Sequence, residues 1–343
     1  MNISEFDFYL PDGYIATKPV YPRDSAKMLV LDKDNKTFCD SYFFDLPKFL
    51  KPGDILVLND SKVIPARLYG LSGGRRFEVL LATNIKDSLW KCWVKPGRKA
   101  QIGTEFIFSN NLKANLVKRN DEIFTFEFNL VGKEFYKEIY KIGEIPIPPY
   151  IKKERKGESS LVDKADYQTI YAKNEGSVAA PTAGLHFTKE LIEKLKKSGV
   201  GVEKVTLHVG LGTFQPVNTE KIGDFKIHSE YCELSDITAK RLNKAKNEGK
   251  RIIAVGTTSL RVLESAATDG KLKSFSGETQ IYIYPGYRFR YVDGMITNFH
   301  LPKSSLLLLV SALAGKEYIL NSYNYAVENG YRFYSYGDGM LIL

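Results

Sequence analysis

Six short β-rich stretches follow one another closely between residues 66 and 129, and they constrain the fold more than any other feature of the chain. They are Ala66–Leu71, Phe77–Thr83, Leu89–Val94, Glu105–Ser109, Leu112–Lys118 and Ile123–Asn129. Turn-forming residues stand between them, as at Ser72-Gly73-Gly74 and Pro96-Gly97. Short strands joined by tight turns are typical of a small closed barrel, so the sequence predicts a β-barrel here.

The flanking sequence has a different pattern, in which strands alternate with helices. Arg251–Val255 indicates a strand, Gly256–Ser259 a turn, and Leu260–Ala267 a helix with one buried face. The pattern recurs in a strand over Met295–Phe299, followed by a helix from about Ser304 to Ala314 that Gly315 ends. Such units are typical of α/β proteins, and 343 residues leave room for two domains.

The proline-rich segment Ile145–Tyr150 cannot form a regular strand ladder. We interpret it as the border at which the chain leaves the barrel and returns to the α/β domain.

All four histidines lie in the second half of the chain, and three of them stand in strings rich in glycine, proline and hydroxyl residues. These strings are Ala179–Thr188, Thr206–Val217 and Thr297–Ser305. We expect His208, Thr257 and His300 at the carboxyl ends of strands, where α/β proteins bind ligands. A single histidine is more often structural, but its recurrence in turns favours a functional site. The spacing of the histidines matches no zinc motif, so we expect no metal.

Composition narrows the class of protein. Lys and Arg number 49 against 40 Asp and Glu, a formal net charge of +9, which attracts polyanions where the charge is clustered. The basic run Lys152–Lys156 fits either nucleic-acid contact or a solvated loop. The apolar run Leu306–Leu313 is far shorter than the ~20 residues of a membrane helix. With no signal peptide and three dispersed cysteines, we expect a cytoplasmic protein without disulfides or membrane contact.

Five further strings occur in order along the chain. They are F-D-F-Y-L-P (Phe6–Pro11), N-D-S-K-V-I-P-A-R-L (Asn59–Leu68), H-S-E-Y (His228–Tyr231), V-G-T-T-S-L-R (Val255–Arg261) and F-Y-S-Y-G-D-G-M (Phe333–Met340). With the three histidine strings, they resemble the bacterial S-adenosylmethionine:tRNA ribosyltransferase-isomerase family of the queuosine pathway. The resemblance runs from Phe6 to Met340.

The resemblance implies the reaction and the fold. The ribosyl moiety of S-adenosylmethionine would move to 7-aminomethyl-7-deazaguanine at the tRNA wobble position and rearrange, giving epoxyqueuosine-tRNA, adenine and methionine. S-adenosylmethionine would be a consumed co-substrate rather than a bound cofactor, and tRNA would be the partner of a monomeric enzyme. The implied fold is α/β, with a barrel-like main domain of mixed, largely parallel strands over 1–65 and 151–343. A small antiparallel β-barrel insert would span 66–150.

This chemistry needs a base to remove a proton and an acid to protonate the departing adenine. Imidazole can do both, so we hypothesise that His186 and His208 are the acid/base pair. Glu230 or Asp60 would orient or charge one of them.

The residues expected to bind substrate follow the predicted strands. They are Thr257, Thr258, Ser259, Arg261, Thr297, Asn298 and His300. A helix N-terminus with a guanidinium suits the methionine carboxylate or ribose hydroxyls, although hydroxyl residues there also serve as helix caps. Arg23 and Arg67 are expected either to contact tRNA phosphates or to form buried salt bridges.

Two other classes of protein fit parts of the pattern. An RNA-binding module without catalysis would explain the basic charge and the barrel. A metal-free hydrolase of nucleosides would explain the polar strings.

Overall fold

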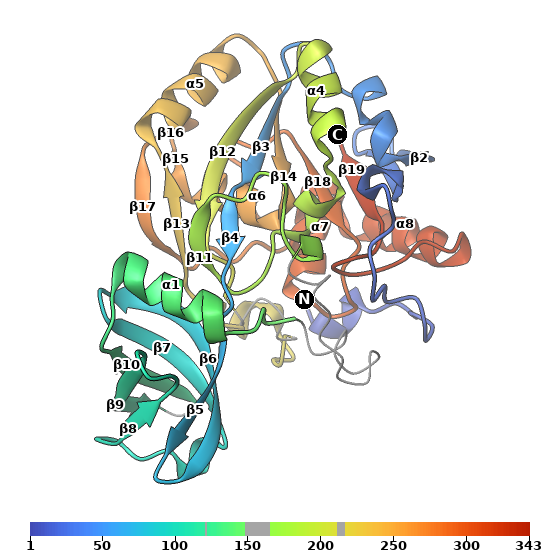
Figure 1. Cartoon of the computed structure of the whole chain (residues 1–343). Coiled ribbons are helices and arrows are strands. Elements are labelled where there is room, and N and C mark those ends of the chain that lie inside the picture. The colour runs from blue at the N-terminus through green and yellow to red at the C-terminus, as the bar shows by residue number, and fades with distance from the viewer. Residues whose placement is uncertain (121, 148–164, 211–216) are drawn as a thin grey trace.

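The computed structural model describes residues 1–120, 122–147, 165–210 and 217–343, which form an α/β domain and a barrel beside it (Figure 1). The basic run Lys152–Lys156 lies outside the described residues. Residues 148–150 of the proline-rich segment and residues 211–216 of the second histidine string also lie outside the described residues.

A nine-stranded sheet is the centre of the α/β domain. In spatial order its strands are β17 (Phe275–Thr279), β13 (Glu230–Leu234), β12 (Gly201–Leu207), β3 (Ile55–Asn59), β14 (Ile252–Val255), β18 (Gly294–Asn298), β19 (Gly339–Ile342), β1 (Lys27–Asp32) and β2 (Thr37–Tyr42). Four neighbouring pairs are parallel. They are β12–β3, β3–β14, β14–β18 and β19–β1. The other four neighbouring pairs are antiparallel.

The expected mixed α/β sheet is therefore confirmed, with fewer parallel pairs than predicted. The sheet is open, with edges at β17 and β2, so among the described strands the closed barrel is the insert. β14 and β18 are buried along their whole length, which explains their continuous apolar sequence.

Five α-helices of the α/β domain lie within the described residues. They are α4 (Lys189–Lys197), α5 (Asp236–Asn247), α6 (Gly256–Ala266), α7 (Ser305–Ala314) and α8 (Lys316–Glu328). Thr188, Ser235 and Ser304 cap α4, α5 and α7, because each side chain accepts a hydrogen bond from a first-turn amide. The predicted helix ending at Gly315 is confirmed, and that glycine has φ +98°.

Helix α6 differs from its prediction in two ways. Gly256–Ser259 forms its first turn rather than a separate turn before it. Ten of its eleven residues are buried rather than one face, because α6 contacts several strands of the sheet while the segment after β17 covers its other side. A helix enclosed in this way cannot be recognised from an amphipathic pattern.

Each of the six strands predicted in the insert is present, and together they close into an antiparallel barrel. In spatial order they are β10 (Ile123–Phe128), β7 (Leu89–Lys95), β6 (Arg75–Lys86), β5 (Arg67–Ser72), β8 (Glu105–Ile107) and β9 (Lys113–Asn120). Helix α1 (Gly132–Ile142) packs on the barrel, where Phe135 stacks on Trp90 with ring centroids 5.3 Å apart.

The barrel is inserted between two short strands that pair in parallel, β4 (Ser61–Val63) and β11 (Asn174–Ser177). Backbone hydrogen bonds between Arg67 and Glu144 hold the start and the end of the insert side by side. The predicted borders, 65/66 and 150/151, remain predictions, and the second lies outside the described residues.

The remaining elements are short. The strands β15 (Ala267–Thr268) and β16 (Lys271–Leu272) form a hairpin, and the 3-10 turns are η1 (Ile3–Phe6), η2 (Arg23–Ser25), η3 (Phe43–Lys48), η4 (Gly97–Lys99), η5 (Thr182–His186) and η7 (Ile222–Asp224). Across the described ranges, no helix is both long and apolar enough to span a bilayer.

Glu264 fixes α6 to the segment that covers it. Its carboxylate is fully buried and accepts hydrogen bonds from the Tyr287 hydroxyl and from the backbone amides of Arg290, Tyr291 and Val292, at 2.9–3.0 Å. Removing this acceptor leaves buried amides without partners, so E264A should lower the free energy of unfolding by about 3 kcal/mol. Urea denaturation followed by circular dichroism measures this change.

The control is E328A, which removes an exposed carboxylate from α8 and should change stability by less than about 0.5 kcal/mol. Both tryptophans, Trp90 and Trp93, lie in the barrel strand β7, so their fluorescence reports on the insert separately. Equal circular-dichroism midpoints for E264A and E328A would contradict this role of Glu264.

Candidate active site

Four parallel strands end side by side at one edge of the sheet, and a polar or glycine residue follows each. Asp60 follows β3, His208 follows β12, Gly256 follows β14 and His300 lies two residues beyond β18. The predicted position of His208, Thr257 and His300 at the carboxyl ends of strands is therefore confirmed, with Thr257 in the first turn of α6 after β14. This edge of the sheet carries two cavities.

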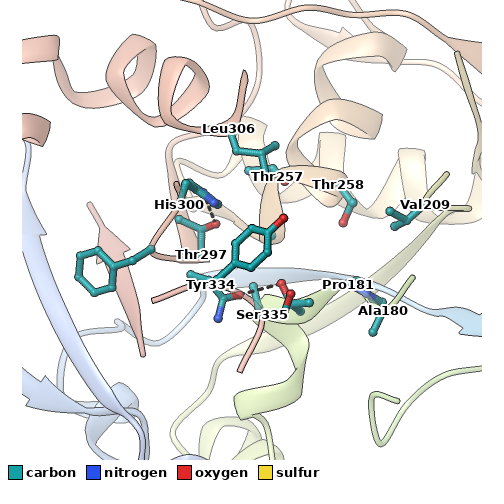
Figure 2. A pocket seen from close by; sticks show the side chains of 15 residues that line it. Ala180, Pro181, Val209, Thr257, Thr258, Thr297, His300, Leu306, Tyr334 and Ser335 are labelled. Carbon is teal, nitrogen blue, oxygen red and sulfur yellow. Dashed lines mark hydrogen bonds between the residues drawn. The ribbon is translucent and has the colours of Figure 1, made fainter. Parts of the chain in front are cut away.

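The first cavity, called here the α6 cavity, lies at the N-terminus of α6 and has a volume of about 540 Å³ including its mouth (Figure 2). It is lined by Ala180, Pro181, Thr182, Ala183, Val209, Gly256, Thr257, Thr258, Thr297, Asn298, Phe299, His300, Leu306, Tyr334 and Ser335. Only about 50 Å³ of this space is the cavity proper, below the range of typical small-molecule sites, so most of it is the open mouth. No charged side chain is among these residues, so hydroxyls, amides and aromatic rings provide the polar contacts.

The three hydroxyl residues at the start of α6 have different surroundings. Val255 occupies the N-cap position, and no side chain caps the helix through a hydrogen bond. Ser259 is fully buried and donates to the carbonyl of Val255 at 2.8 Å. The Thr258 hydroxyl is buried without a hydrogen-bond partner among the described residues, and Thr258 lines the cavity beside Thr257. The capping alternative is therefore wrong for this helix.

His300 and Thr297 form a polar pair on the β18 side of the cavity. Nε2 of His300 lies 3.2 Å from the Thr297 hydroxyl, and the two share a hydrogen bond. The His300 amide donates to the hydroxyl of Tyr323 at 3.1 Å. Burial lowers the pKa of His300 to about 3, so this ring is neutral near pH 7.

His186 lies behind the cavity rather than in its lining. Asn298, which lines the cavity, donates from Nδ2 to Nε2 of His186 at 3.0 Å and accepts from the Thr182 hydroxyl at 3.0 Å. The imidazole stacks on Phe43 with ring centroids 4.0 Å apart. Burial, with the charges of Arg332 and Arg23, lowers the pKa of His186 to about 3. This geometry positions Asn298 and leaves the imidazole neutral.

Tyr334 and Ser335 also line the cavity, and sequence reasoning assigned them no role. Tyr334 has φ +74°, which is rare for a bulky residue, and Figure 2 shows its ring among the lining side chains. Asp338 fixes this turn by accepting hydrogen bonds from the amides of Arg332 and Lys27 at 2.8 and 3.1 Å. The string Phe333–Met340 marked this segment as part of the family pattern. The string alone does not indicate that the chain turns there through a strained residue.

The second cavity, called here the junction cavity, lies between the barrel and the α/β domain and has a volume of about 830 Å³ including its mouth. It is lined by Ala82, Thr83, Asn84, Ile85, Tyr136, Glu175, Gly176, His208, Gly210, Ser229, Glu230 and Tyr231. Nδ1 of His208 is buried and has no hydrogen-bond partner within the described part of the chain.

Asp60 is the carboxylate whose charge acts on His208. Burial lowers the pKa of His208, and the negative charge of Asp60 partly opposes this change. Oδ1 of Asp60 accepts hydrogen bonds from Asn174 Nδ2 at 3.0 Å and from the Thr206 hydroxyl at 2.8 Å. Of the two carboxylates proposed from sequence to charge a catalytic histidine, the geometry favours Asp60 for His208.

Glu230 and Arg261 form a buried ion pair with each other. The other Glu230 oxygen accepts from the Gly210 amide at 2.9 Å, and Arg261 Nε donates to the Ile281 carbonyl at 3.3 Å. Arg261 points away from the α6 cavity and does not line it. The prediction that it holds an anion beside Thr258 is therefore not supported, because Glu230 already neutralises it.

Arg23 and Arg67 make internal contacts. Arg23 donates to the carbonyls of Ala165 and Gln168 at 2.7 and 2.8 Å and lies 3.9 Å from Asp166. Arg67 lies 3.6 Å from Glu78 on the neighbouring barrel strand. Of the two alternatives left open by the sequence, the geometry favours salt bridges over tRNA phosphates.

His186, His208 and Thr258 do not line one cavity among the described residues, so the hypothesis that His186 and His208 act as one acid/base pair is not supported by their positions. His208 and Val209 are consecutive in an extended segment, so their side chains face opposite sides, and they line different cavities. His186 is separated from the α6 cavity by Asn298. In the described ranges, no group of three or more His, Cys, Asp or Glu is arranged to hold a metal ion.

Comparison with known proteins gives a full-length match. The model of the family described as "Queuosine biosynthesis protein" matches residues 3–342. Proteins of Halothermothrix orenii and Carboxydothermus hydrogenoformans, both named S-adenosylmethionine:tRNA ribosyltransferase-isomerase, are 48% and 49% identical over the whole of both chains. The crystal structure of S-adenosylmethionine tRNA ribosyltransferase from Thermotoga maritima is 37% identical, with a TM-score of 0.58. That match covers 99% of this chain and all of the other.

The buried neutral histidines predict a loss of stability in mild acid. The unfolded chain binds protons at its histidines below pH 6.5, whereas His186 and His300, with pKa values of about 3, stay neutral in the fold. Stability therefore falls as pH decreases, by about 2 kcal/mol per histidine between pH 6.5 and 5. H300Q should lose about that much less stability than the wild type between pH 7.5 and 5, measured by denaturant unfolding.

The control is H228Q, which replaces an exposed histidine that lines neither cavity. An H300Q protein that loses as much stability in acid as the wild type would contradict the assignment of His300 as a buried neutral ring.

Proposed function

The chain belongs to the S-adenosylmethionine:tRNA ribosyltransferase-isomerase family, and we propose that its α6 cavity binds S-adenosylmethionine. The protein is a ribosyltransferase-isomerase of queuosine biosynthesis. This activity excludes the two other classes that the sequence left open, a non-catalytic RNA-binding module and a nucleoside hydrolase.

One observation carries the placement of S-adenosylmethionine. The Thr258 hydroxyl is buried at the N-terminus of α6 without a partner among the described residues, whereas Ser259 beside it is satisfied. A buried hydroxyl without a partner costs free energy unless a ligand supplies one. The first-turn amides of α6 favour an anion, so the methionine carboxylate or a ribose hydroxyl fits here. Thr257 and Thr297 offer further hydroxyls in the same lining.

Tyr334 supplies aromatic surface to the same cavity, whereas the Phe299 ring is fully buried against Tyr323, Tyr331 and Phe333. Aromatic rings attract cations through their negative faces, and the sulfonium of S-adenosylmethionine is a cation without N–H or O–H donors. An uncharged cavity with an aromatic ring in its lining therefore suits this ligand better than a pocket lined by carboxylates.

The reaction that follows is transfer of the ribosyl moiety to 7-aminomethyl-7-deazaguanine at the tRNA wobble position. Rearrangement gives epoxyqueuosine-tRNA and releases adenine and methionine. S-adenosylmethionine is consumed and is not a retained cofactor. Its tRNA partner supports the expectation of a cytoplasmic enzyme, and we expect it to act as a monomer.

The histidines divide into different roles. His208 is a neutral imidazole in a cavity and is the candidate base. His300 lines the α6 cavity and is the candidate to hydrogen-bond the nucleoside there. His186 acts as a positioning residue that holds Asn298, instead of as a partner of His208 in one acid/base pair. Asp60 adjusts the charge at His208, and Glu230 acts by holding Arg261 and Gly210.

The α6 cavity predicts a specific effect of T258V, which replaces the hydroxyl by a methyl group of similar size. Loss of one hydrogen bond to the ligand should raise the Kd for S-adenosylmethionine about tenfold, equal to about 1.4 kcal/mol. Isothermal titration calorimetry without tRNA measures it directly. S259A on the same helix should leave this Kd within about twofold, because its hydroxyl bonds only the Val255 carbonyl among the described residues.

A second prediction concerns salt. With a formal net charge of +9, tRNA binding should release counterions, so its Kd should rise at least about tenfold between 50 and 200 mM salt. The Kd for S-adenosylmethionine should barely change, because no charged side chain is among the described residues that line the α6 cavity. Filter binding and calorimetry in the same buffers compare the two. A tRNA affinity independent of salt would contradict broad phosphate contact.

A further inference from the structure

We propose that the junction cavity binds the 7-aminomethyl-7-deazaguanine base of the tRNA, with the β-barrel insert forming one of its walls. This inference rests on the proposed function, in which the α6 cavity takes S-adenosylmethionine. It gives the insert a direct part in recognising the substrate base.

Two parts of the chain build the junction cavity. The insert contributes Ala82–Ile85 from the end of β6 and Tyr136 from α1. The α/β domain contributes Glu175 and Gly176 from β11, together with residues that follow or begin sheet strands. A substrate in this cavity therefore touches both units, and removing the insert wall would open the cavity to solvent.

The charge of the lining selects the kind of ligand. The chain has a net charge of +9, yet the described lining contains two carboxylates, Glu175 and Glu230, and no Lys or Arg. Lys62 and Arg261 pair with these carboxylates without lining the cavity. Carboxylates only accept hydrogen bonds. Glu230 is already paired with Arg261, so Glu175, whose partner Lys62 is partly exposed, is the carboxylate that suits a donor-rich ligand such as a guanine-type base with its ring N–H, its amino group and an aminomethyl ammonium.

The junction cavity offers flat and apolar surfaces, which suit an RNA base that is no longer stacked on its neighbours. The rings of His208 and Tyr231 lie nearly parallel, 16° apart, with centroids 5.9 Å from each other. The Tyr231 hydroxyl is fixed by a 2.8 Å hydrogen bond with Ser276. Ile85 lines the cavity and is 47% exposed, so its apolar side chain is accessible to a ligand there. Proteins that read single-stranded RNA loops bind splayed bases on such surfaces.

His208 can then carry out the first proton transfer. One proton moves from the ammonium nitrogen of the base to the neutral imidazole, and the lone pair left on that nitrogen makes it a nucleophile for the ribosyl carbon. Gly176 lets the backbone of β11 lie close to the His208 ring, because a Cβ at this position would lie 3.0 Å from the ring. The two cavities adjoin the same segment, since Val209 lines the α6 cavity while His208 and Gly210 line the junction cavity.

The adenine of S-adenosylmethionine is also a flat heterocycle with a donor group, so the test separates the two sources. I85A removes the apolar edge on β6, and I102A is the matched control, since Ile102 is 60% exposed on the same barrel away from this lining. For each variant, calorimetry gives the Kd of S-adenosylmethionine alone. Initial rates give the KM for tRNA carrying the precursor base.

We expect I85A to raise this KM about tenfold, the effect of losing about 1.4 kcal/mol of base stacking, and to leave the Kd of S-adenosylmethionine within twofold. I102A should match the wild type in both. A rise in the Kd of S-adenosylmethionine with I85A would assign the cavity to the adenosine instead. Unchanged values of both constants would overturn the proposal. T258V affects only the α6 cavity, so its failure leaves this result interpretable.

Glu175 tests the charge argument independently. Binding of tRNA with the precursor base is compared with that of the same tRNA carrying guanine, which lacks the ammonium. E175Q should reduce the preference for the precursor at least about fivefold, since a hydrogen bond to a charged group is worth more than about 1 kcal/mol. Circular dichroism checks that the variant is folded. A preference unchanged from the wild type would overturn the assignment of this carboxylate to the ammonium.

Discussion

The burial of α6 on all sides is the constraint on which both cavities depend. Its first turn presents Thr257 and Thr258 to the α6 cavity. One turn further, Arg261 holds Glu230, which lines the junction cavity. Glu264, on the next turn, binds the backbone of the covering segment. Because each contact is buried and polar, the helix cannot rotate or slide without leaving charges or donors unpaired. One helix therefore fixes the relative position of the two cavities.

The sequence predicted the elements well where the local pattern decides them, and the site poorly where tertiary contacts decide it. Alternation and turn residues located all six barrel strands, and Ser304 and Gly315 marked both ends of α7. Gly256–Ser259 looked like a turn because hydroxyl and glycine residues favour turns, whereas packing against the sheet extends the helix through them. The strings did identify residues that lie at the carboxyl ends of the strands. Which cavity a side chain lines depends on the alternation at His208 and Val209 and on Asn298 covering His186, and neither follows from spacing alone.

The position of the insert in the chain explains how a distant barrel reaches the site. It leaves the α/β domain after β4 and returns before β11, and these strands pair with each other close to His208. The Arg67–Glu144 backbone bonds close the base of the insert. The end of β6 and helix α1 are thereby brought against Glu175 and Gly176, so that Ile85 and Tyr136 complete the lining. An insertion elsewhere in the sheet order would place the same barrel away from the carboxyl ends of the strands.

At this edge of the sheet, burial has different consequences for the histidines and for the carboxylate of Glu230. It lowers the pKa of His186, His208 and His300, which keeps each imidazole neutral and able to share a hydrogen bond. The buried carboxylate of Glu230 is instead paired with Arg261, since an unpaired carboxylate would be too costly in the same surroundings. In the proposed complex, a positively charged base can therefore approach the junction cavity without meeting a protonated histidine that would repel it.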